Sequence, residues 1–131
     1  MRAIELFAGA GGLALATANA GFQHAAVLEW NPNACATLRR NHAAGLPQLA
    51  GTEIVEGDVS HYDFQKHAGT VDLVSGGPPC QPFSIGGNHG GMDDERNMFP
   101  QAVRAVREVQ PKAFIFENVK DLLRTFVGTL L

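Results

Sequence analysis

Short apolar segments alternate with helical segments along the whole chain, and this alternation restricts the possible folds more than any other feature. Strands are predicted over residues 3–7, 25–29, 52–56, 71–75 and 113–116, and helices over residues 13–20, 31–42 and 93–110. Strands that are separated by helices are joined by right-handed crossovers and lie parallel. The sequence therefore predicts an α/β fold, a parallel sheet of about five strands with helices on both faces. The last strand is entirely apolar and is expected to be buried on both faces.

The size and composition of the chain are those of one globular domain. The 131 residues are 45% hydrophobic, and a chain of this length can bury roughly two-thirds of its unfolded surface. No apolar run approaches the roughly 18 residues of a membrane span, and the start lacks a signal peptide, so a cytoplasmic protein without a membrane partner is expected. The net charge of −3 argues weakly against this chain alone holding a polyanion. The histidines show no metal-ligand spacing, and no metal is predicted.

A glycine loop follows the first predicted strand, at the edge of the sheet where ligands of such folds bind. Its sequence is Phe7-Ala8-Gly9-Ala10-Gly11-Gly12, and glycines let backbone N–H groups approach a ligand closely. The loop alone is weak evidence, because any tight strand-to-helix turn has the same composition. Glu29, however, ends the second strand 17 residues after Gly12. This spacing is near the ~20 residues at which an acid meets a ribose diol in dinucleotide-binding folds.

Two further residues at strand ends match an adenosine-type ligand. Trp30 could pack against an adenine ring, and Asp58, after the third strand, could accept a hydrogen bond from an exocyclic amine. Each of these residues has a simpler explanation, as a solvated loop acid or as an aromatic side chain that fills a gap. Together with the glycine loop and Glu29 they favour an adenosine cofactor. The loop lacks the third, spaced glycine of the dinucleotide fingerprint, which suits a cofactor without a pyrophosphate.

The two cysteines have different surroundings, so a disulfide is not expected. Cys35 lies in a predicted helix and is interpreted as a small buried hydrophobe. Cys80 follows two prolines and precedes a third, in a segment that can be neither helix nor central strand. Its thiol is therefore predicted to be presented from a rigid loop at the ligand-binding edge, where a nucleophile would be needed.

A second candidate catalytic group, Glu117, follows the fifth strand at the same edge. A carboxylate at the mouth of a buried strand is unfavourable unless it has a partner or a role, although Glu117 could also simply cap the next helix. If the fourth and fifth strands are neighbours, Cys80 and Glu117 face one cleft beside the cofactor. A thiol, an acid and an adenosine cofactor together indicate covalent catalysis coupled to group transfer.

Six segments resemble the DNA cytosine-5 methyltransferase family and occur in the order typical of that family. They are ELFAGAGG (5–12), EWN (29–31), GDV (57–59), GGPPCQPFS (76–84), DERNMF (94–99) and ENV (117–119). The resemblance implies a Rossmann-like, S-adenosylmethionine-dependent methyltransferase fold. It also implies that the Cys80 thiolate attacks carbon 6 of a cytosine flipped out of double-stranded DNA, while Glu117 protonates ring nitrogen 3. Carbon 5 then takes the methyl group, and S-adenosylhomocysteine is the cofactor product.

The resemblance assigns further residues to the cofactor and to the substrate. Glu29 is expected on the ribose hydroxyls and Asp58 on the adenine amine, and Asn118 is expected to orient the catalytic loop. The complete cofactor set is Phe7, Ala8, Gly9, Gly11, Gly12, Glu29, Trp30, Asp58, Val59 and Pro78. The substrate set is Pro79, Gln81, Ser84, Asn118 and Val119.

The chain departs from the family pattern in two respects. Residues 86–91 are less basic than is usual for that loop, which leaves the phosphate contacts of the loop in question. The chain also ends at Leu131, before the target-recognition region and the C-terminal segments of the family. Residues 1–131 are therefore expected to be the N-terminal part of the catalytic domain, in a truncated enzyme or in one subunit of a split enzyme with a second, C-terminal partner. Two alternatives remain: a non-catalytic cofactor-binding fragment that needs a partner chain, and a tRNA cytosine-5 methyltransferase.

Overall fold

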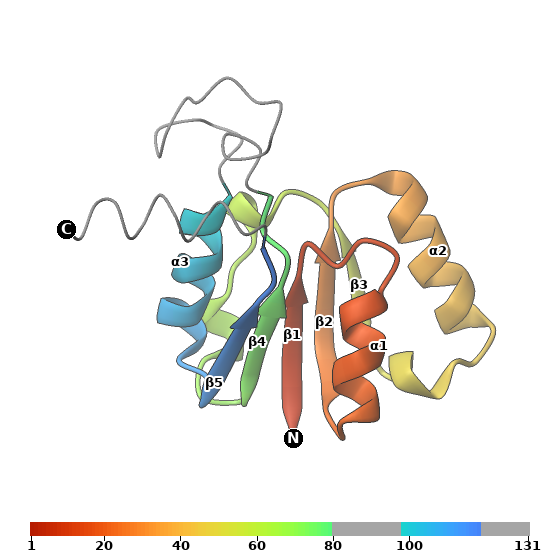
Figure 1. Cartoon of the computed structure of the whole chain (residues 1–131), viewed down its shortest axis with the longest axis horizontal. Coiled ribbons are helices and arrows are strands. Elements are labelled where there is room, and N and C mark those ends of the chain that lie inside the picture. Colours follow the sequence, from red (N-terminus) through yellow and green to blue (C-terminus); the bar gives the residue numbers. More distant parts are fainter. Residues whose placement is uncertain (80–97, 119–131) are drawn as a thin grey trace.

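One parallel sheet forms the centre of the molecule (Figure 1). The structure is a computed structural model, and it describes residues 1–79 and 98–118. The strands are β1 (Arg2–Leu6), β2 (Gln23–Glu29), β3 (Glu53–Glu56), β4 (Leu73–Gly76) and β5 (Ala113–Phe116). They are arranged in the order β3-β2-β1-β4-β5, and every neighbouring pair is parallel. The five strands and the parallel sheet confirm the predicted fold, and the switch in strand order lies between β1 and β4.

The helices lie close to the predicted positions, with one exception. They are α1 (Gly12–Asn19), α2 (Pro32–Ala43) and α3 (Phe99–Val109), with 3₁₀ turns η1 (Pro47–Leu49), η2 (Val59–His61) and η3 (Gln65–His67) that were not predicted. Asn31 caps α2 as expected, because its side-chain oxygen accepts hydrogen bonds from the N–H groups of Asn33 and Ala34 at 2.9 and 3.2 Å. Helix α3 was predicted to begin at residue 93, but Met98 is its non-helical N-cap. Residues 93–97 lie outside the described residues.

Helices cover both faces of the sheet, as predicted. On one face, α3 contributes Ala102, Ala105 and Val109 to a core that also contains Ile4 and Leu6 of β1. On the other face, Ala14 of α1 and Leu38 of α2 pack with Val27 of β2. Figure 1 shows α1 and α2 together beside β1, β2 and β3, with α3 on the side of β4 and β5. The sheet therefore separates two apolar cores.

The burial of β5 differs from the prediction. Phe114 and Ile115 are 59% and 51% exposed, whereas only Phe116 is partly buried against the core and packs edge-on against the ring of Phe99. Strand β5 is the last strand of the described sheet and pairs with β4 alone. The prediction was wrong because an all-apolar run does not distinguish a central strand from one at the edge of the sheet.

Candidate functional site

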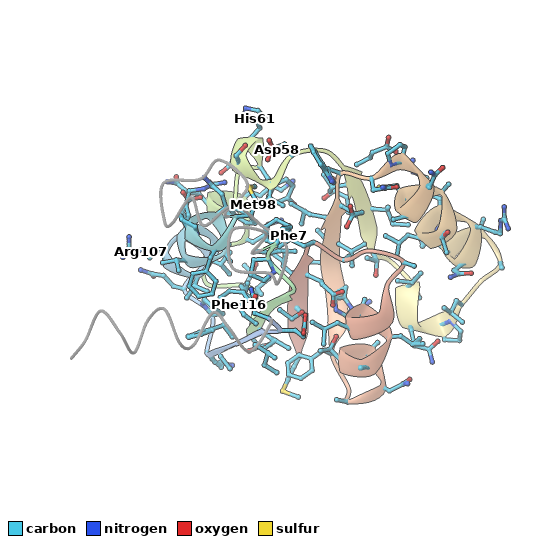
Figure 2. All side chains as sticks on the ribbon, turned by 45° about the horizontal axis from the view of Figure 1, so that its top comes forward. Phe7, Asp58, His61, Met98, Arg107 and Phe116 are labelled. Atoms are coloured by element: carbon cyan, nitrogen blue, oxygen red, sulfur yellow. The ribbon has the colours of Figure 1, made fainter. Side chains whose placement is uncertain are left out.

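Most of the sequence-predicted site residues that the structure describes lie at one edge of the sheet. In a parallel sheet the carboxyl ends of all strands face the same way, and the arrowheads in Figure 1 end at this edge. Phe7 follows β1, Glu29 ends β2, Asp58 follows β3 and Glu117 follows β5. Figure 2 looks toward the same edge and shows Phe7, Asp58 and Met98 there. Segments that are distant in the sequence therefore meet around one site.

The glycine loop after β1 has an unusual backbone. Phe7, Gly9 and Gly11 all have positive φ angles, of 55°, 54° and 96°. At Gly11 a Cβ atom would lie 2.8 Å from Cδ2 of Leu38, so both the backbone angle and the packing against α2 require glycine there. Next to Gly9 and Gly12, in contrast, a Cβ atom would meet no atom within 4 Å. The outer side of the loop is open, which leaves room for a ligand against its backbone.

Glu29 holds this loop in place from the end of β2. Its Oε2 accepts a hydrogen bond from the N–H of Gly9 at 2.7 Å, and its Oε1 accepts from the N–H groups of Trp30 and Asn31 at 3.0 and 2.8 Å. The residue is only 8% exposed, so it is not a solvated loop acid. This structural role was not predicted, because its backbone partners become apparent only when β1 and β2 are placed side by side.

Trp30 and Asp58, which are expected at the adenine, are exposed, whereas Val59, which was also predicted to bind the cofactor, is buried. The indole of Trp30 is 76% exposed and therefore accessible to a ligand. Asp58 is also exposed, and its Oδ1 accepts a hydrogen bond from the N–H of Ser60 at 2.8 Å. The hydrogen bonds from Ser60 hold the pKa of the Asp58 carboxyl below its usual value, so that the group is an ionised acceptor at neutral pH. The side chain of Val59 lies in the core, and only its backbone could reach a ligand.

Strands β4 and β5 are neighbours. The predicted common cleft of Cys80 and Glu117 requires this arrangement. The N–H of Glu117 donates to the carbonyl of Gly76 at 2.9 Å, and a Cβ atom at Gly77 would lie 3.4 Å from Oε2 of Glu117. Asn118 donates from Nδ2 to the carbonyl of Pro78 at 2.9 Å. Glu117 and Asn118 therefore lie against the segment that leads directly into Cys80.

Four residues of the predicted site lie outside the described residues. They are Cys80, Gln81, Ser84 and Val119. The described residues on either side of the Cys80 segment are hydrogen-bonded to each other, since the N–H of Met98 donates to the carbonyl of Pro79 at 3.2 Å. Cys35 is fully buried and donates from Sγ to the carbonyl of Glu29 at 3.3 Å, which confirms its interpretation as a buried cysteine.

A buried polar cluster below the glycine loop was missed. Glu5, next to the last residue of β1, is 1% exposed, and its Oε2 accepts a hydrogen bond from the Ser75 hydroxyl at 3.3 Å. His24 lies beside it, with Nε2 at 3.9 Å from the same oxygen and at 3.0 Å from the hydroxyl of Thr17. Burial raises the pKa of Glu5 to about 7. An acid within an otherwise apolar strand was the sequence signal that could have indicated this cluster.

The described residues offer neither a membrane-spanning helix nor a metal centre. Over residues 1–79 and 98–118, all helices are too short or too polar to cross a bilayer. The same residues contain no group of three or more potential metal ligands from His, Cys, Asp and Glu.

A comparison with family models decides the class of protein. The model of the C-5 cytosine-specific DNA methylases matches residues 1–129. The chain belongs to this family. Its members are S-adenosylmethionine-dependent methyltransferases, which agrees with the Rossmann-like parallel sheet.

Relatives and solved structures of this family are considerably longer than the chain. Type II methyltransferase M.NgoMIV of Neisseria gonorrhoeae is 45% identical over 92% of this chain and 36% of its own length. M.AquIA of a Picosynechococcus species is 40% identical over 98% of this chain and 52% of its own length. An Escherichia coli prophage protein described as a DNA modification methyltransferase superimposes with a TM-score of 0.73 at 33% identity, over 99% of this chain and 35% of its own. The chain thus spans between about a third and a half of these proteins.

Proposed function

We propose that residues 1–131 are the N-terminal part of a catalytic domain that transfers a methyl group from S-adenosylmethionine to carbon 5 of cytosine in DNA. The observation that carries this proposal is the contact of Glu117 and Asn118 with Gly77 and Pro78, directly before Cys80 and at the same sheet edge as the open glycine loop. This contact holds an acid against the segment that leads into the predicted nucleophile. Membership of the C-5 cytosine-specific DNA methylase family supports the choice of reaction.

Several described residues could contact the adenine ring, the adenine amine and the ribose of S-adenosylmethionine. The open backbone at Gly9 and Gly12 leaves space for the ligand, and the ionised Asp58 can accept from the adenine amine. The exposed indole of Trp30 offers a flat apolar surface to the adenine ring. Glu29 accepts hydrogen bonds from three backbone N–H groups, and the one lone pair that remains would accept from the ribose diol. The bound cofactor would supply a methyl group on a sulfonium.

The chain's own residues would activate the base. The Cys80 thiolate forms a bond to carbon 6 of an extruded cytosine, while Glu117 donates a proton to nitrogen 3 and neutralises the developing charge. Carbon 5 then takes the methyl group as the sulfonium–carbon bond breaks. Loss of the carbon 5 proton to a base re-forms the double bond and expels the Cys80 thiolate, and nitrogen 3 returns its proton to Glu117. Asn118, through its hydrogen bond to Pro78, would keep the segment before Cys80 in place.

Binding of DNA would need more positive charge than this chain carries. Its net charge is −3, and phosphate contacts by Lys and Arg supply most of the affinity for nucleic acid. We therefore propose that a C-terminal region or a second subunit provides the target-recognition surface. A tRNA substrate and a purely cofactor-binding role are the competing functions.

A methyl-transfer assay on the complete protein tests the proposal. The full reading frame that encodes this chain, purified with any partner chain, is incubated with radiolabelled S-adenosylmethionine and either duplex DNA or tRNA. We expect label in DNA and 5-methylcytosine as the only modified nucleoside after digestion, with residues 1–131 alone at least about 100-fold less active because the DNA-binding surface is missing. Label in tRNA alone, or on an exocyclic nitrogen, would contradict the proposal.

A further inference from the structure

Arg104, in the middle of α3, binds the backbone of the turn that follows β3. Its Nη2 donates to the carbonyl of Val59 at 2.8 Å and to that of Ser60 at 3.3 Å. Both terminal nitrogens also lie 3.3 Å from the carbonyl of Tyr62. One guanidinium therefore binds three carbonyl groups of η2 and its C-cap and, with five donors, can bind other partners at the same time, which the three donors of an ammonium could not do.

The guanidinium is itself fixed from its other sides. Nε donates to the side-chain oxygen of Gln101 at 2.8 Å, and Nη1 lies 3.1 Å from both carboxylate oxygens of Glu108. Its central carbon is 4.9 Å from the ring centroid of the buried Phe64. These contacts hold the guanidinium in one position. Its hydrogen bonds to the carbonyl groups of η2 then hold that turn in place.

The turn held by Arg104 is the turn that orients Asp58. Asp58 is the N-cap of η2, and its carboxylate accepts from the N–H of Ser60, the residue whose carbonyl accepts from Arg104. The Asp58 carboxylate and the guanidinium bind the same turn from its N–H and carbonyl groups respectively, so the guanidinium acts on Asp58 through the turn. The position of the Asp58 carboxylate at the sheet edge accordingly depends on the hydrogen bonds that Arg104 makes to this turn.

We propose that Arg104 is a positioning residue for the adenine end of the cofactor site: by holding η2 it places the Asp58 carboxylate, and so determines how strongly a 6-aminopurine is preferred over a 6-oxopurine. The proposal rests on the proposed function, in which Asp58 accepts from the adenine amine. A 6-oxopurine has an acceptor oxygen in place of this amine, so it cannot donate to the carboxylate from this position.

The test compares two ligands that differ only at this group, S-adenosylhomocysteine and S-inosylhomocysteine. Their dissociation constants are measured by calorimetry for the complete protein and for Arg104→Lys. We expect the wild-type protein to prefer the adenosine ligand by at least about tenfold, the value of one charge-assisted hydrogen bond. In Arg104→Lys this preference should fall to within about threefold of unity, through weaker binding of the adenosine ligand alone. The KM for S-adenosylmethionine should rise with kcat nearly unchanged.

Arg107 provides the matched control, because it is exposed on the same helix and Figure 2 shows its side chain directed into solvent. Arg107→Lys should retain the full preference. Asp58→Asn should lose it, and adding Arg104→Lys to Asp58→Asn should reduce it no further, because both act through one carboxylate. A second readout without any ligand is amide exchange at Ser60, which should become faster in Arg104→Lys and remain unchanged in Arg107→Lys.

The outcomes separate this inference from the function on which it rests. If the wild-type protein binds neither ligand, the proposed function fails and this inference fails with it. If the wild-type protein discriminates and Arg104→Lys discriminates equally, only the role of Arg104 is overturned. If Arg104→Lys weakens both ligands by the same factor, Arg104 has a general structural role and the inference is likewise wrong.

Discussion

Replacement of Cys80 by serine is expected to reduce the rate of cytosine methylation by on the order of 10³-fold or more. A serine hydroxyl is not ionised at neutral pH, whereas a thiol can form a thiolate, which is the attacking species. Without a bond at carbon 6, carbon 5 of the cytosine ring is not activated for methyl transfer. The measurement is single-turnover methylation of duplex DNA by the complete protein, which isolates chemistry from product release.

The chain contains its own control for this experiment. Cys35 is buried below the end of β2 and donates to the carbonyl of Glu29, so Cys35→Ser removes a thiol without touching the proposed nucleophile. It should keep a methylation rate within about threefold of the wild type and change mainly stability. If Cys80→Ser kept a rate within about tenfold of the wild type, a covalent mechanism through Cys80 would be excluded.

Replacement of Glu5 by glutamine is expected to increase the free energy of unfolding at pH 8 by as much as about 3 kcal/mol. Burial raises the folded-state pKa of Glu5 from 4.5 to about 7, so the folded protein binds this proton more tightly than the unfolded chain does. The contribution of Glu5 to stability is complete below pH 4.5 and is lost as the pH rises through about 7. Glutamine keeps a similar shape without the buried charge, so the gain should vanish at low pH.

Urea denaturation between pH 4.5 and 8 measures this effect. Glu53→Gln, at an exposed site on β3, is the control and should change the unfolding free energy by less than about 0.5 kcal/mol at every pH. A Glu5→Gln variant that is less stable than the wild type at pH 8 would contradict the prediction. It would mean that hydrogen bonds to Glu5, from Ser75 and from the backbone N–H of Ala14, outweigh the unfavourable burial of the charge.

His24 titrates next to Glu5 and acts in the opposite direction. Burial lowers the pKa of His24, so its contribution to stability is present above the unfolded pKa of 6.5 and is lost as the pH falls. Its Nδ1 is buried without a hydrogen-bond partner, and protonation there would bury an unpaired donor. The pH profile of the wild-type protein is therefore flatter than that of Glu5→Gln, in which Glu5 no longer opposes the loss of stability through His24 at low pH.

The secondary structure of the described residues could be predicted largely from local signals. Pro32 after Asn31 marks the start of α2, and apolar runs mark each strand, because these signals depend on the neighbours of a residue in sequence. The start of α3 was misplaced because an acidic pair at residues 93–94 resembles a helix start, whereas the helix begins after Met98. The exposure of Phe114 depends on which strand lies at the edge, a property of the whole sheet.

The location of the described candidate residues at one edge of the sheet was predictable, and their interactions were not. The rule that ligands bind at the carboxyl ends of parallel strands led to Glu29, Asp58 and Glu117. It could not reveal that Glu29 binds the N–H of Gly9, or that Arg104 binds the carbonyl of Val59 across 45 residues of sequence. Such contacts arise from the packing of elements, which the order of residues along the chain does not display.

The candidate site exists only when the sheet exists, because its residues come from the ends of different strands. A denatured chain has no equivalent arrangement, so a ligand of this site would bind the native state alone. Folding and occupancy are then thermodynamically linked, and ligand at 100 times its dissociation constant adds about 2.7 kcal/mol to the unfolding free energy. For a chain of this size, such an increment raises the midpoint of heat denaturation by on the order of 10 °C. Thermal melting would thus report affinity for adenosine compounds without any DNA, any methyl transfer or any knowledge of the target sequence.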